Sequence, residues 1–425
     1  MDLLIKNAHI VSEFYDLEKF YDVYISDGII KEIGQKLSYD CEKLNADGNL
    51  LMPGLIDISS KICESGYENK DNVIRVSESA AAGGFTTLTT SPNTLPIIDN
   101  KSVVEYVYAK AAAGSVINMY LFGSMTKGCE GVEIAEIGEM IDKGVIAIAD
   151  GGASIQNSDT LKNIMLYIKM FDVPLIMQCM DKDLAGDGMV NSGYMSTKLG
   201  LKGNPIEAEE IMVSRNLILA KHLRCKMHLT NITGAKSVHL IRDAKGDTGL
   251  ITAGTCPHYF TLTENEVDNF NTFAKVNPPL RTQEDVDGII EGLRDGTIDI
   301  ISSGHMPAPF DRKNTEFEKA AYGISSLETS LMVSYTALVK SGVISVLELA
   351  DKMAKNPAKI LGLRTKGIIK EGMDADLVVV DVNNEYVVDS SFFASKAKYS
   401  PYDGHKFYGK PICTICGGKI VGKYS

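Results

Sequence analysis

The chain has 425 residues, which is enough for a large α/β barrel with a smaller domain beside it. Its formal net charge of −12 at pH 7 disfavours nonspecific binding to nucleic acid and to anionic membranes. There is no apolar run of about 18 residues, the N-terminus resembles a strand more than a signal peptide, and eight cysteines are scattered along the chain, so we expect a cytoplasmic protein without a transmembrane helix.

Both ends of the chain carry short alternating apolar segments separated by turns. Strands are predicted at 3–11, 23–26 and 29–33, and again at 374–381 and 412–422. The shared pattern predicts one small β-sandwich domain assembled from residues 1–52 and residues 365–425.

The middle of the chain, residues 53–364, alternates apolar strands with helices. Strands are predicted at 50–59, 85–92, 117–124, 145–150, 174–179, 225–233, 251–257 and 298–305, and helices at 205–223, 235–245 and 284–293 among others. This alternation predicts a (β/α)8 TIM barrel, with a doubly wound open sheet as the alternative on pattern alone. In such a barrel, chemistry belongs to the C-terminal ends of the strands.

Five strings at or near those strand ends carry a family resemblance. They are Pro-Gly-Leu-Ile-Asp at 53–57, Gly-Gly-Phe-Thr-Thr-Leu-Thr-Thr-Ser-Pro-Asn-Thr at 83–94, Lys-Val-Asn-Pro-Pro-Leu-Arg at 275–281, Tyr-Gly-Ile-Ser-Ser-Leu-Glu-Thr at 322–329, and the segment 370–380. In this order and spacing, the chain resembles the dihydroorotase branch of the amidohydrolase superfamily, close to allantoinase.

The resemblance implies a binuclear zinc centre and hydrolysis of a cyclic amide. The family binds its metals with a His-x-His pair on strand one, a bridging Asp or carboxylated Lys on strand four, one His each on strands five and six, and an Asp on strand eight. A hydroxide shared by the two cations attacks the amide carbonyl, and the strand-eight Asp handles its proton.

This sequence departs from that pattern at the metal-ligand positions. They are occupied by Ser59, Lys61, Gly151, Gln178, Asn231 and Gly304. A register shifted by one residue would put Asp150 in place of Gly151. Neutral amides and hydroxyls bind zinc weakly, glycine offers no ligand, and Lys61 adds a positive charge, so we expect no metal, no other cofactor and no catalytic residue, with Gly304 at the position of the catalytic Asp.

The positions that contact substrate in the family are also altered. Cys63 replaces an Arg expected to pair with a substrate carboxylate, and Ala308 replaces a His. Asn93 and Asn277 remain. These four residues are predicted to line a vestigial substrate pocket.

Three alternative hypotheses about the function of these residues stay open. A relocated mononuclear metal site could use Asp57, Asp150, His228, His258 and His305. Lys61 could be a base in a dry pocket, although pairing with Asp150 in place of the metals is favoured. Cys63, Cys179 or Cys256 could be a nucleophile, although no His partner follows from spacing and buried small side chains are favoured.

The resemblance also implies a function for a family member that lacks the metal centre. Non-catalytic members of this family associate with aspartate transcarbamoylase, so we expect a structural or regulatory partner of that enzyme in pyrimidine biosynthesis. A twofold homodimer is expected as well. The alternatives are an active cyclic-amide hydrolase with a relocated or absent metal, and a pseudoenzyme that senses a small ligand.

Overall fold

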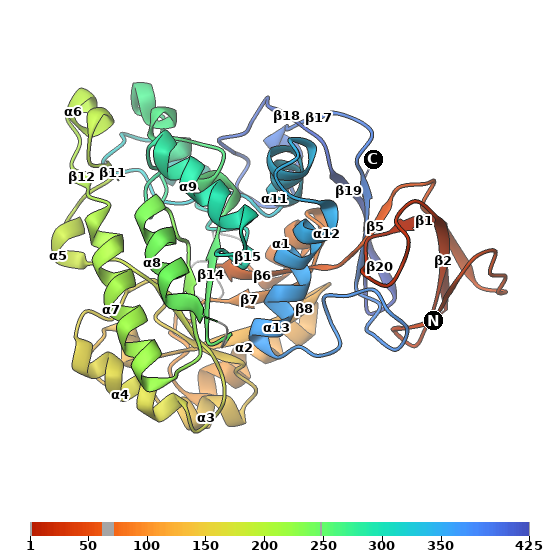
Figure 1. Ribbon diagram of the computed structural model, residues 1–425, viewed down its shortest axis with the longest axis horizontal. Coiled ribbons are helices and arrows are strands. Elements are labelled where there is room, and N and C mark those ends of the chain that lie inside the picture. The colour runs from red at the N-terminus through yellow and green to blue at the C-terminus, as the bar shows by residue number, and fades with distance from the viewer. Residues whose placement is uncertain (1, 62–71, 247–248, 425) are drawn as a thin grey trace.

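The computed structural model describes residues 2–61, 72–246 and 249–424. It contains two eight-stranded sheets with helices packed around one of them, and Figure 1 shows the helix-covered sheet beside the smaller sheet near the two termini. Among the described residues, no helix is long and apolar enough to cross a membrane.

The larger sheet is the predicted barrel. Its strands are β6 (Leu55–Ser60), β7 (Phe85–Thr90), β8 (Asn118–Ser124), β9 (Ala147–Ala149), β10 (Leu175–Gln178), β13 (Met227–Thr230), β14 (Ile251–Thr255) and β15 (Ile300–Ile301). Each strand pairs in parallel with its neighbours in that order. The segments that follow the first and last strands are hydrogen-bonded, since Lys61 N, after β6, donates to His305 O, after β15, at 2.9 Å; this contact closes the sheet into a (β/α)8 barrel.

Helices surround the barrel because each presents an apolar stripe to the strands. Their bounds are α1 (Val73–Ala82), α2 (Lys101–Gly114), α3 (Ile137–Asp142), α4 (Ser158–Ile168), α5 (Lys182–Ala185), α6 (Tyr194–Leu199), α7 (Glu207–Leu223), α8 (Ala235–Lys245), α9 (Gln283–Arg294), α10 (Phe310–Lys313), α11 (Ser330–Ser334), α12 (Val346–Ala350) and α13 (Asn356–Leu361). In α4, for example, Leu161, Ile164, Met165 and Ile168 are buried at helical spacing. The helix predicted at 235–245 has those bounds, and the one predicted at 205–223 begins two residues later.

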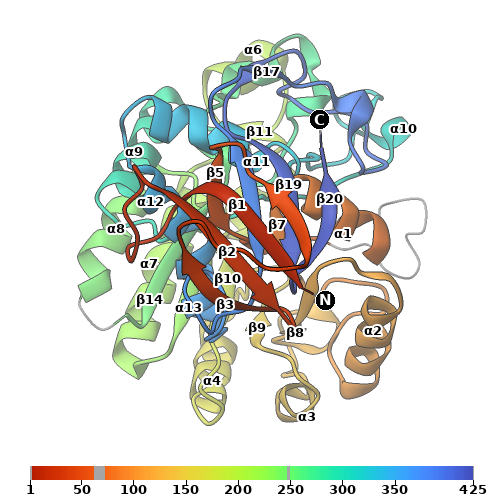
Figure 2. The same ribbon diagram turned by 90° about the vertical axis from the view of Figure 1, so that its right-hand side faces the viewer.

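The second sheet combines the two ends of the chain, as the alternating patterns indicated. Its strands are β1 (Leu3–Ile10), β2 (Phe20–Ser26), β3 (Ile29–Gly34), β4 (Glu42–Asn45), β5 (Leu50–Pro53), β16 (Leu377–Asp381), β19 (Lys410–Cys416) and β20 (Lys419–Lys423). Strand β5 pairs with both β1 and β16, so it joins the two halves. Figure 2 shows this sheet in front of the barrel.

The single strand predicted at 50–59 is wrong, because the chain changes sheets at Gly54. Strand β5 ends at Pro53 in the small sheet and β6 begins at Leu55 in the barrel. Gly54 packs against Thr86, and a Cβ at residue 54 would lie 2.2 Å from Thr86 Oγ1. Two strands from different sheets pass close together here, and only glycine fits at the crossing.

Three segments extend beyond the C-terminal ends of the barrel strands. The first carries α5, β11 (Val190–Asn191), β12 (Gly203–Asn204) and α6. The second carries the 3-10 turns η3 (Pro257–Tyr259), η4 (Glu264–Phe270) and η5 (Thr272–Ala274), and the third carries β17 (Tyr386–Val387) and β18 (Lys406–Phe407). These segments surround the mouth of the barrel, where the predicted site residues converge.

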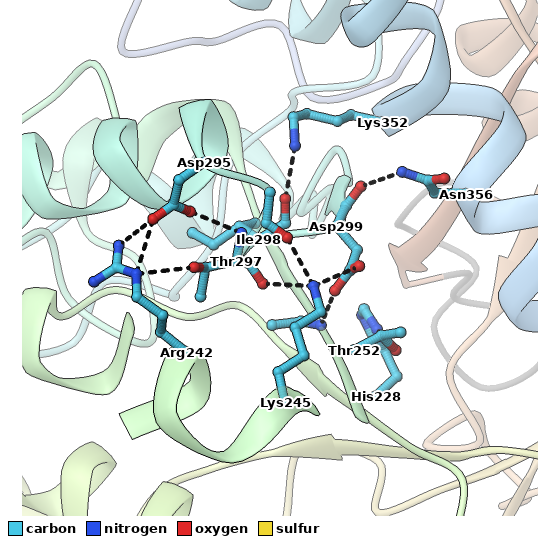
Figure 3. A network of polar contacts seen from close by, with 12 residues as sticks. His228, Arg242, Lys245, Thr252, Asp295, Thr297, Ile298, Asp299, Lys352 and Asn356 are labelled. Carbon is cyan, nitrogen blue, oxygen red and sulfur yellow. Dashed lines mark hydrogen bonds and ion pairs between the residues drawn. The ribbon is translucent and has the colours of Figure 1, made fainter. Parts of the chain in front are cut away.

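The opposite end of the barrel is held by charged side chains. Figure 3 shows Lys245, at the end of α8, reaching the backbone that precedes β15. Its ammonium group donates to Asp299 Oδ1 and Gly296 O, each at 2.7 Å. Lys352 donates to Ile298 O at 2.7 Å. These contacts position the last and shortest barrel strand.

Candidate functional site

A cavity of about 330 Å³ opens at the C-terminal ends of the barrel strands. All six predicted metal-ligand positions contribute to its wall: Ser59, Lys61, Gly151, Gln178, Asn231 and Gly304. The structure therefore brings together the positions that the sequence placed on five different strand ends.

Ser59 and Asn231 are hydrogen-bonded to each other across the mouth. Ser59 Oγ donates to Asn231 Oδ1 at 3.0 Å, although 172 residues separate them in the sequence. The same oxygen accepts from Cys256 Sγ at 3.2 Å and from Thr230 Oγ1 at 3.3 Å. Asn231 has a positive φ of 56°, a conformation that asparagine tolerates better than most residues. We call Ser59, Thr230, Asn231 and Cys256 the amide cluster; its hydrogen bonds connect β6, β13 and the end of β14.

Gly304 leaves no room for a side chain at the position of the family's catalytic Asp. A Cβ at residue 304 would lie 2.8 Å from both Cys256 Sγ and His258 Cε1. The backbone there has a φ of +64°, which favours glycine. The volume that an aspartate would need is therefore filled by a thiol and an imidazole.

The space beside Gly151, on the other side of the mouth, is also occupied by a neighbouring side chain. Its φ is +66°, and a Cβ at this residue would lie 2.9 Å from Cys129 Sγ. Cys129 lies in a 3-10 turn, η1 (Lys127–Cys129), after β8, and its sulfur is 3.2 Å from Ser124 Oγ. Cys129 was not among the predicted site residues, since nothing in the local sequence pattern of that loop indicates a place at the mouth.

Asp150, the alternative ligand in a shifted register, is held by backbone groups. Its Oδ1 accepts from Gly152 N at 2.9 Å and its Oδ2 accepts from Gln178 N at 3.0 Å. Burial raises the pKa of this carboxyl to about 7, and the charge of Lys182 opposes that rise. The favoured pairing of Asp150 with Lys61 stays a prediction. What the structure does show is that Asp150 fixes the backbone of Gln178, the residue at the strand-five ligand position.

Asp57 closes the barrel beneath the mouth. Its Oδ2 accepts from Ser303 Oγ at 2.5 Å and its Oδ1 accepts from Ser303 N at 2.8 Å, which connects β6 to the segment after β15. Asp57 is completely buried, and burial raises its pKa. With both oxygens engaged in this way, Asp57 has a structural role rather than the ligand role considered from the sequence.

The three histidines of the relocated-site hypothesis lie in different surroundings. His228 Nδ1 is 2.9 Å from Thr252 Oγ1, and this side chain is absent from the cavity wall. His305 Nδ1 accepts from Ser326 N at 3.2 Å. His258 lines the cavity with its Nδ1 buried and unpaired among the described residues. Burial lowers the pKa of both His228 and His258 to about 3, so both are neutral at pH 7.

The side chains at the mouth do not fit the family's two zinc ions. Within residues 2–61, 72–246 and 249–424, no group of three or more His, Cys, Asp or Glu side chains is placed to hold a metal ion. Asn231 Oδ1 is already engaged by three donors, and the two glycine positions are filled by sulfur and imidazole. Zinc prefers thiolate, imidazole and carboxylate ligands, and the ligand positions here offer a hydroxyl, two amides and an ammonium group.

Two of the cysteines that were considered as alternative nucleophiles, Cys179 and Cys256, are buried, as the favoured interpretation of them expected. Burial raises the pKa of the Cys179 and Cys256 thiols above their usual value, so both are protonated at pH 7. Cys179 Sγ accepts from Asn216 Nδ2 at 3.3 Å. Cys63 lies outside the described residues.

The other residues of the predicted substrate pocket are only partly brought together. Asn277 lines the cavity, whereas Asn93 and Ala308 are not on its wall. Ala308 is buried, and its backbone N donates to Tyr399 Oη at 2.9 Å. Asn93 instead packs near Gly151, where a Cβ at residue 151 would lie 3.5 Å from Asn93 Cβ.

A barrel with this mouth and a second sheet built from both termini defines the amidohydrolase class. Residues 48–237 match the Dihydro-orotase-like family and residues 322–422 match the Amidohydrolase family. A dihydroorotase of Ruminiclostridium cellulolyticum is 46% identical over 422 residues, covering 99% of this chain and 98% of the relative. A dihydroorotase of Acetivibrio thermocellus is 43% identical, with 99% and 98% covered. The chain belongs to the dihydroorotase family.

Solved structures show the same architecture. The L-hydantoinase (dihydropyrimidinase) of Arthrobacter aurescens superposes with a TM-score of 0.89 at 26% identity, covering 99% of this chain and 96% of that protein. The dihydropyrimidinase of Brevibacillus agri superposes with a TM-score of 0.86 at 20% identity, covering 100% and 95%. These similarities confirm the predicted fold, a (β/α)8 barrel with an additional β domain, and exclude the open doubly wound sheet.

Proposed function

We propose that this chain is a dihydroorotase-family protein of pyrimidine biosynthesis that has lost the binuclear metal centre and does not hydrolyse dihydroorotate. The observation that supports this proposal is the amide cluster: Ser59 and Asn231, at two ligand positions, are hydrogen-bonded to each other. Gly151 and Gly304 offer no ligand, and neighbouring side chains fill their space. A site without ligands for two cations has no means of generating hydroxide at neutral pH by the family's route.

We further propose that the protein acts as a structural or regulatory partner of aspartate transcarbamoylase, and that it forms a twofold homodimer. The support for the partner is the resemblance to non-catalytic members of the family. A barrel that keeps its fold while its mouth loses metal ligands is suited to such a role, because an interface needs the surface of the fold and not the chemistry of the mouth.

The loss of catalysis is tested by metal analysis and turnover on one preparation. Protein purified without chelators is expected to contain far less than one zinc per chain and to convert dihydroorotate no faster than buffer. A dihydroorotase that retains the His-x-His pair, prepared in parallel, serves as the control. Close to two zinc ions per chain together with turnover would contradict the proposal.

The partnership is tested by size-exclusion chromatography with aspartate transcarbamoylase of the same organism. Co-elution at micromolar concentrations is expected. Independent migration of the two proteins under those conditions would refute this part of the proposal and leave the first part standing.

A second candidate function is an active cyclic-amide hydrolase that uses a relocated metal or none. The relatives that are 46% and 43% identical carry the name dihydroorotase, which favours it. Asp150 lines the cavity, and its pKa of about 7 suits a group that accepts and returns a proton. Turnover of dihydroorotate or hydantoin that is lost in Asp150→Asn, with the fold intact by circular dichroism, would support this candidate over the first.

A further inference from the structure

Helix α7 carries apolar side chains on both of its faces. The inner face packs on the barrel through Met212, Val213 and Leu217, which are buried. On the outer face, Ile211 is 51% exposed and Ile218 is 66% exposed. These two residues are seven positions apart, so they lie on one line along the helix. A helix that covers a barrel normally presents polar groups to solvent, so the outer face of α7 departs from the usual pattern.

The neighbouring helix α4 adds to this exposed apolar surface. The two helices pack against each other on one flank of the barrel (Figure 1). Leu166 in α4 and Met170, just after its end, are 47% and 69% exposed. We call Leu166, Met170, Ile211 and Ile218 the flank patch. Large apolar side chains that are exposed together indicate an interaction surface.

The next two helices along the barrel lack such residues. The exposed side chains of α8 include Lys236, His239 and Asp243, and those of α9 include Asp287 and Glu291. In these two helices, which the structure describes in full, no large apolar side chain is exposed. The flank patch is therefore a feature of α4 and α7 and not of the barrel helices in general.

The outer face of α7 is nearly symmetric about Ser214. Ile211 and Ile218 lie three and four residues from it, and Glu207 and Lys221 each lie seven residues from it, on opposite sides. At 3.6 residues per turn, these five residues fall within an arc of about 80°. Glu207 and Lys221 are exposed, and Ser214 is partly exposed. The acidic and basic ends of this face are therefore related by a reversal of the helix direction.

A second copy of the chain matches this order of side chains. In a twofold dimer, α7 of one copy can lie antiparallel to α7 of the other, with the axis beside Ser214. Ile211 then contacts Ile218 of the other copy, and Glu207 faces Lys221 of the other copy. The small side chain of Ser214 lets the two helices approach closely at the axis. Symmetry alone supplies the complementary charges, whereas an unrelated partner would need a matching sequence of its own.

We propose that the flank patch is the interface of a twofold homodimer in which the two copies of α7 pack antiparallel about Ser214. The inference deepens the proposed function, because it rests on the homodimer proposed there and assigns the surface that forms it. Removal of the apolar side chains from water stabilises the dimer. The pairing of Glu207 with Lys221 sets the relative direction of the two helices.

Sedimentation equilibrium of the full chain and of variants in the flank patch tests the proposal. The wild type is expected to be a dimer at micromolar concentration. Ile218→Glu should raise the dimer dissociation constant roughly a hundredfold, because it buries two unpaired charges per dimer. Its circular dichroism should stay unchanged, since residue 218 is exposed in the single chain. Val132→Glu is the matched control, because Val132 is 74% exposed between β8 and α3, and it should dimerise like the wild type.

An exchange of charges tests the antiparallel order. Glu207→Lys and Lys221→Glu should each weaken the dimer roughly tenfold, because the twofold axis places two repulsive contacts in every dimer. The double variant Glu207→Lys/Lys221→Glu restores opposite charges and should dimerise like the wild type. A double variant that is as weak as the single variants would refute the antiparallel pairing.

The remaining outcomes separate this inference from the proposed function. A monomeric wild type would refute the homodimer together with its interface. A dimer that Ile218→Glu leaves intact would refute the interface and leave the homodimer standing. If that variant stays dimeric and no longer co-elutes with aspartate transcarbamoylase, the flank patch belongs to that enzyme instead. Zinc content and turnover of the same samples test the loss of catalysis independently.

Discussion

The two ends of this barrel differ in their charged side chains. At the N-terminal end of the strands, Lys245 and Asp299 form an ion pair with 2.7 Å between Nζ and Oδ1, and Arg242 pairs with Asp295 at 2.5 Å. Figure 3 shows these charges paired along the backbone that leads into β15. At the C-terminal mouth, the six predicted ligand positions hold a serine, two amides, two glycines and one cation, Lys61.

The comparison distinguishes two roles of charged side chains: at the N-terminal end they stabilise the fold, and at a barrel mouth they serve chemistry. Charged groups at the N-terminal end bind the backbone that leads into β15, a strand of two residues: Lys245 donates to Gly296 O and Lys352 donates to Ile298 O. At the mouth, Ser59 and Asn231 satisfy each other's hydrogen-bonding groups without a charged partner. The barrel keeps its fold although none of the six predicted ligand positions carries a histidine, a cysteine or a carboxylate.

The largest effect is expected at Gly304. Gly304→Ala should lower the free energy of unfolding by about 3–4 kcal/mol, because left-handed strain adds to overlap with Cys256 and His258. Gly296, at the other end of the barrel, has a φ of +80° and nothing within 4 Å of its Cβ position. Gly296→Ala should therefore cost only about 1 kcal/mol. Urea unfolding followed by circular dichroism suits a chain without tryptophan, and equal losses would show that the mouth is not crowded.

The next effect is expected from the charges at the N-terminal end. Asp299→Ala removes the acceptor of Lys245 Nζ and of Ala253 N, and should cost about 2–3 kcal/mol. Asp159→Ala on α4 removes an exposed pairing with Lys162 at 3.9 Å and should change stability by less than about 0.5 kcal/mol. The same unfolding measurement applies. If the two variants lose equally little, these charges do not maintain the fold.

One buried histidine from each end should contribute to acid sensitivity. The pKa of His228 and of His258 is lowered to about 3 by burial, so the unfolded state takes up protons first as the pH falls from about 6.5 toward 3. Stability should therefore fall in that window. In His258→Gln and in His228→Gln, the loss between pH 6.5 and pH 5 should be smaller by about 1.5 kcal/mol. An unchanged acid limb in both variants would mean that neither histidine is buried in its neutral form.

A smaller effect is expected in the amide cluster. Asn231→Gly keeps the left-handed backbone accessible and removes the acceptor shared by Ser59, Thr230 and Cys256, which should cost about 1 kcal/mol. Asn269→Gly is the matched control, since Asn269 has a φ of 55° and an exposed side chain. Its unfolding midpoint should stay at the wild-type value. A loss as large as that of Asn231→Gly would place the effect in the backbone.

The smallest effect is expected from metal removal. A chelator should leave the unfolding temperature of the purified protein unchanged, because a metal stabilises a fold only when the folded state binds it. The same chelator should lower the unfolding temperature of a relative with the intact His-x-His pair. A drop in the present protein would place a metal at the mouth after all.

Much of the architecture could be predicted because hydrophobic periodicity is a local property. The helix at 235–245 was predicted with its observed bounds, and the eight barrel strands were placed in the correct order. The strand at 50–59 was wrong because continuous apolar character cannot show a change of sheet. Gly54 marks that change, and glycine is required there because of a close contact with Thr86 on the neighbouring strand β7.

The sequence predicted which positions of the candidate site come together, but not which side chains surround them. The six ligand positions converge on one cavity, as the strand pattern required, and the residue types alone exclude strong zinc ligands at five of them. The side chains that occupy the space beside Gly151 and Gly304 could not be predicted. Cys129 belongs to a loop without a motif, and its contact with Gly151 depends on how that loop packs.

The sequence by itself determined the family, the barrel and the loss of ligand chemistry, because these follow from residue types and from the short-range spacing of apolar side chains. Only the tertiary structure decided which side chains surround the ligand positions, and that a second cavity opens beside the mouth at Gly152. The physical reason is the range of the contacts: the bond from Ser59 to Asn231 joins residues 172 positions apart. A local sequence pattern cannot predict a hydrogen bond between residues so far apart in the chain.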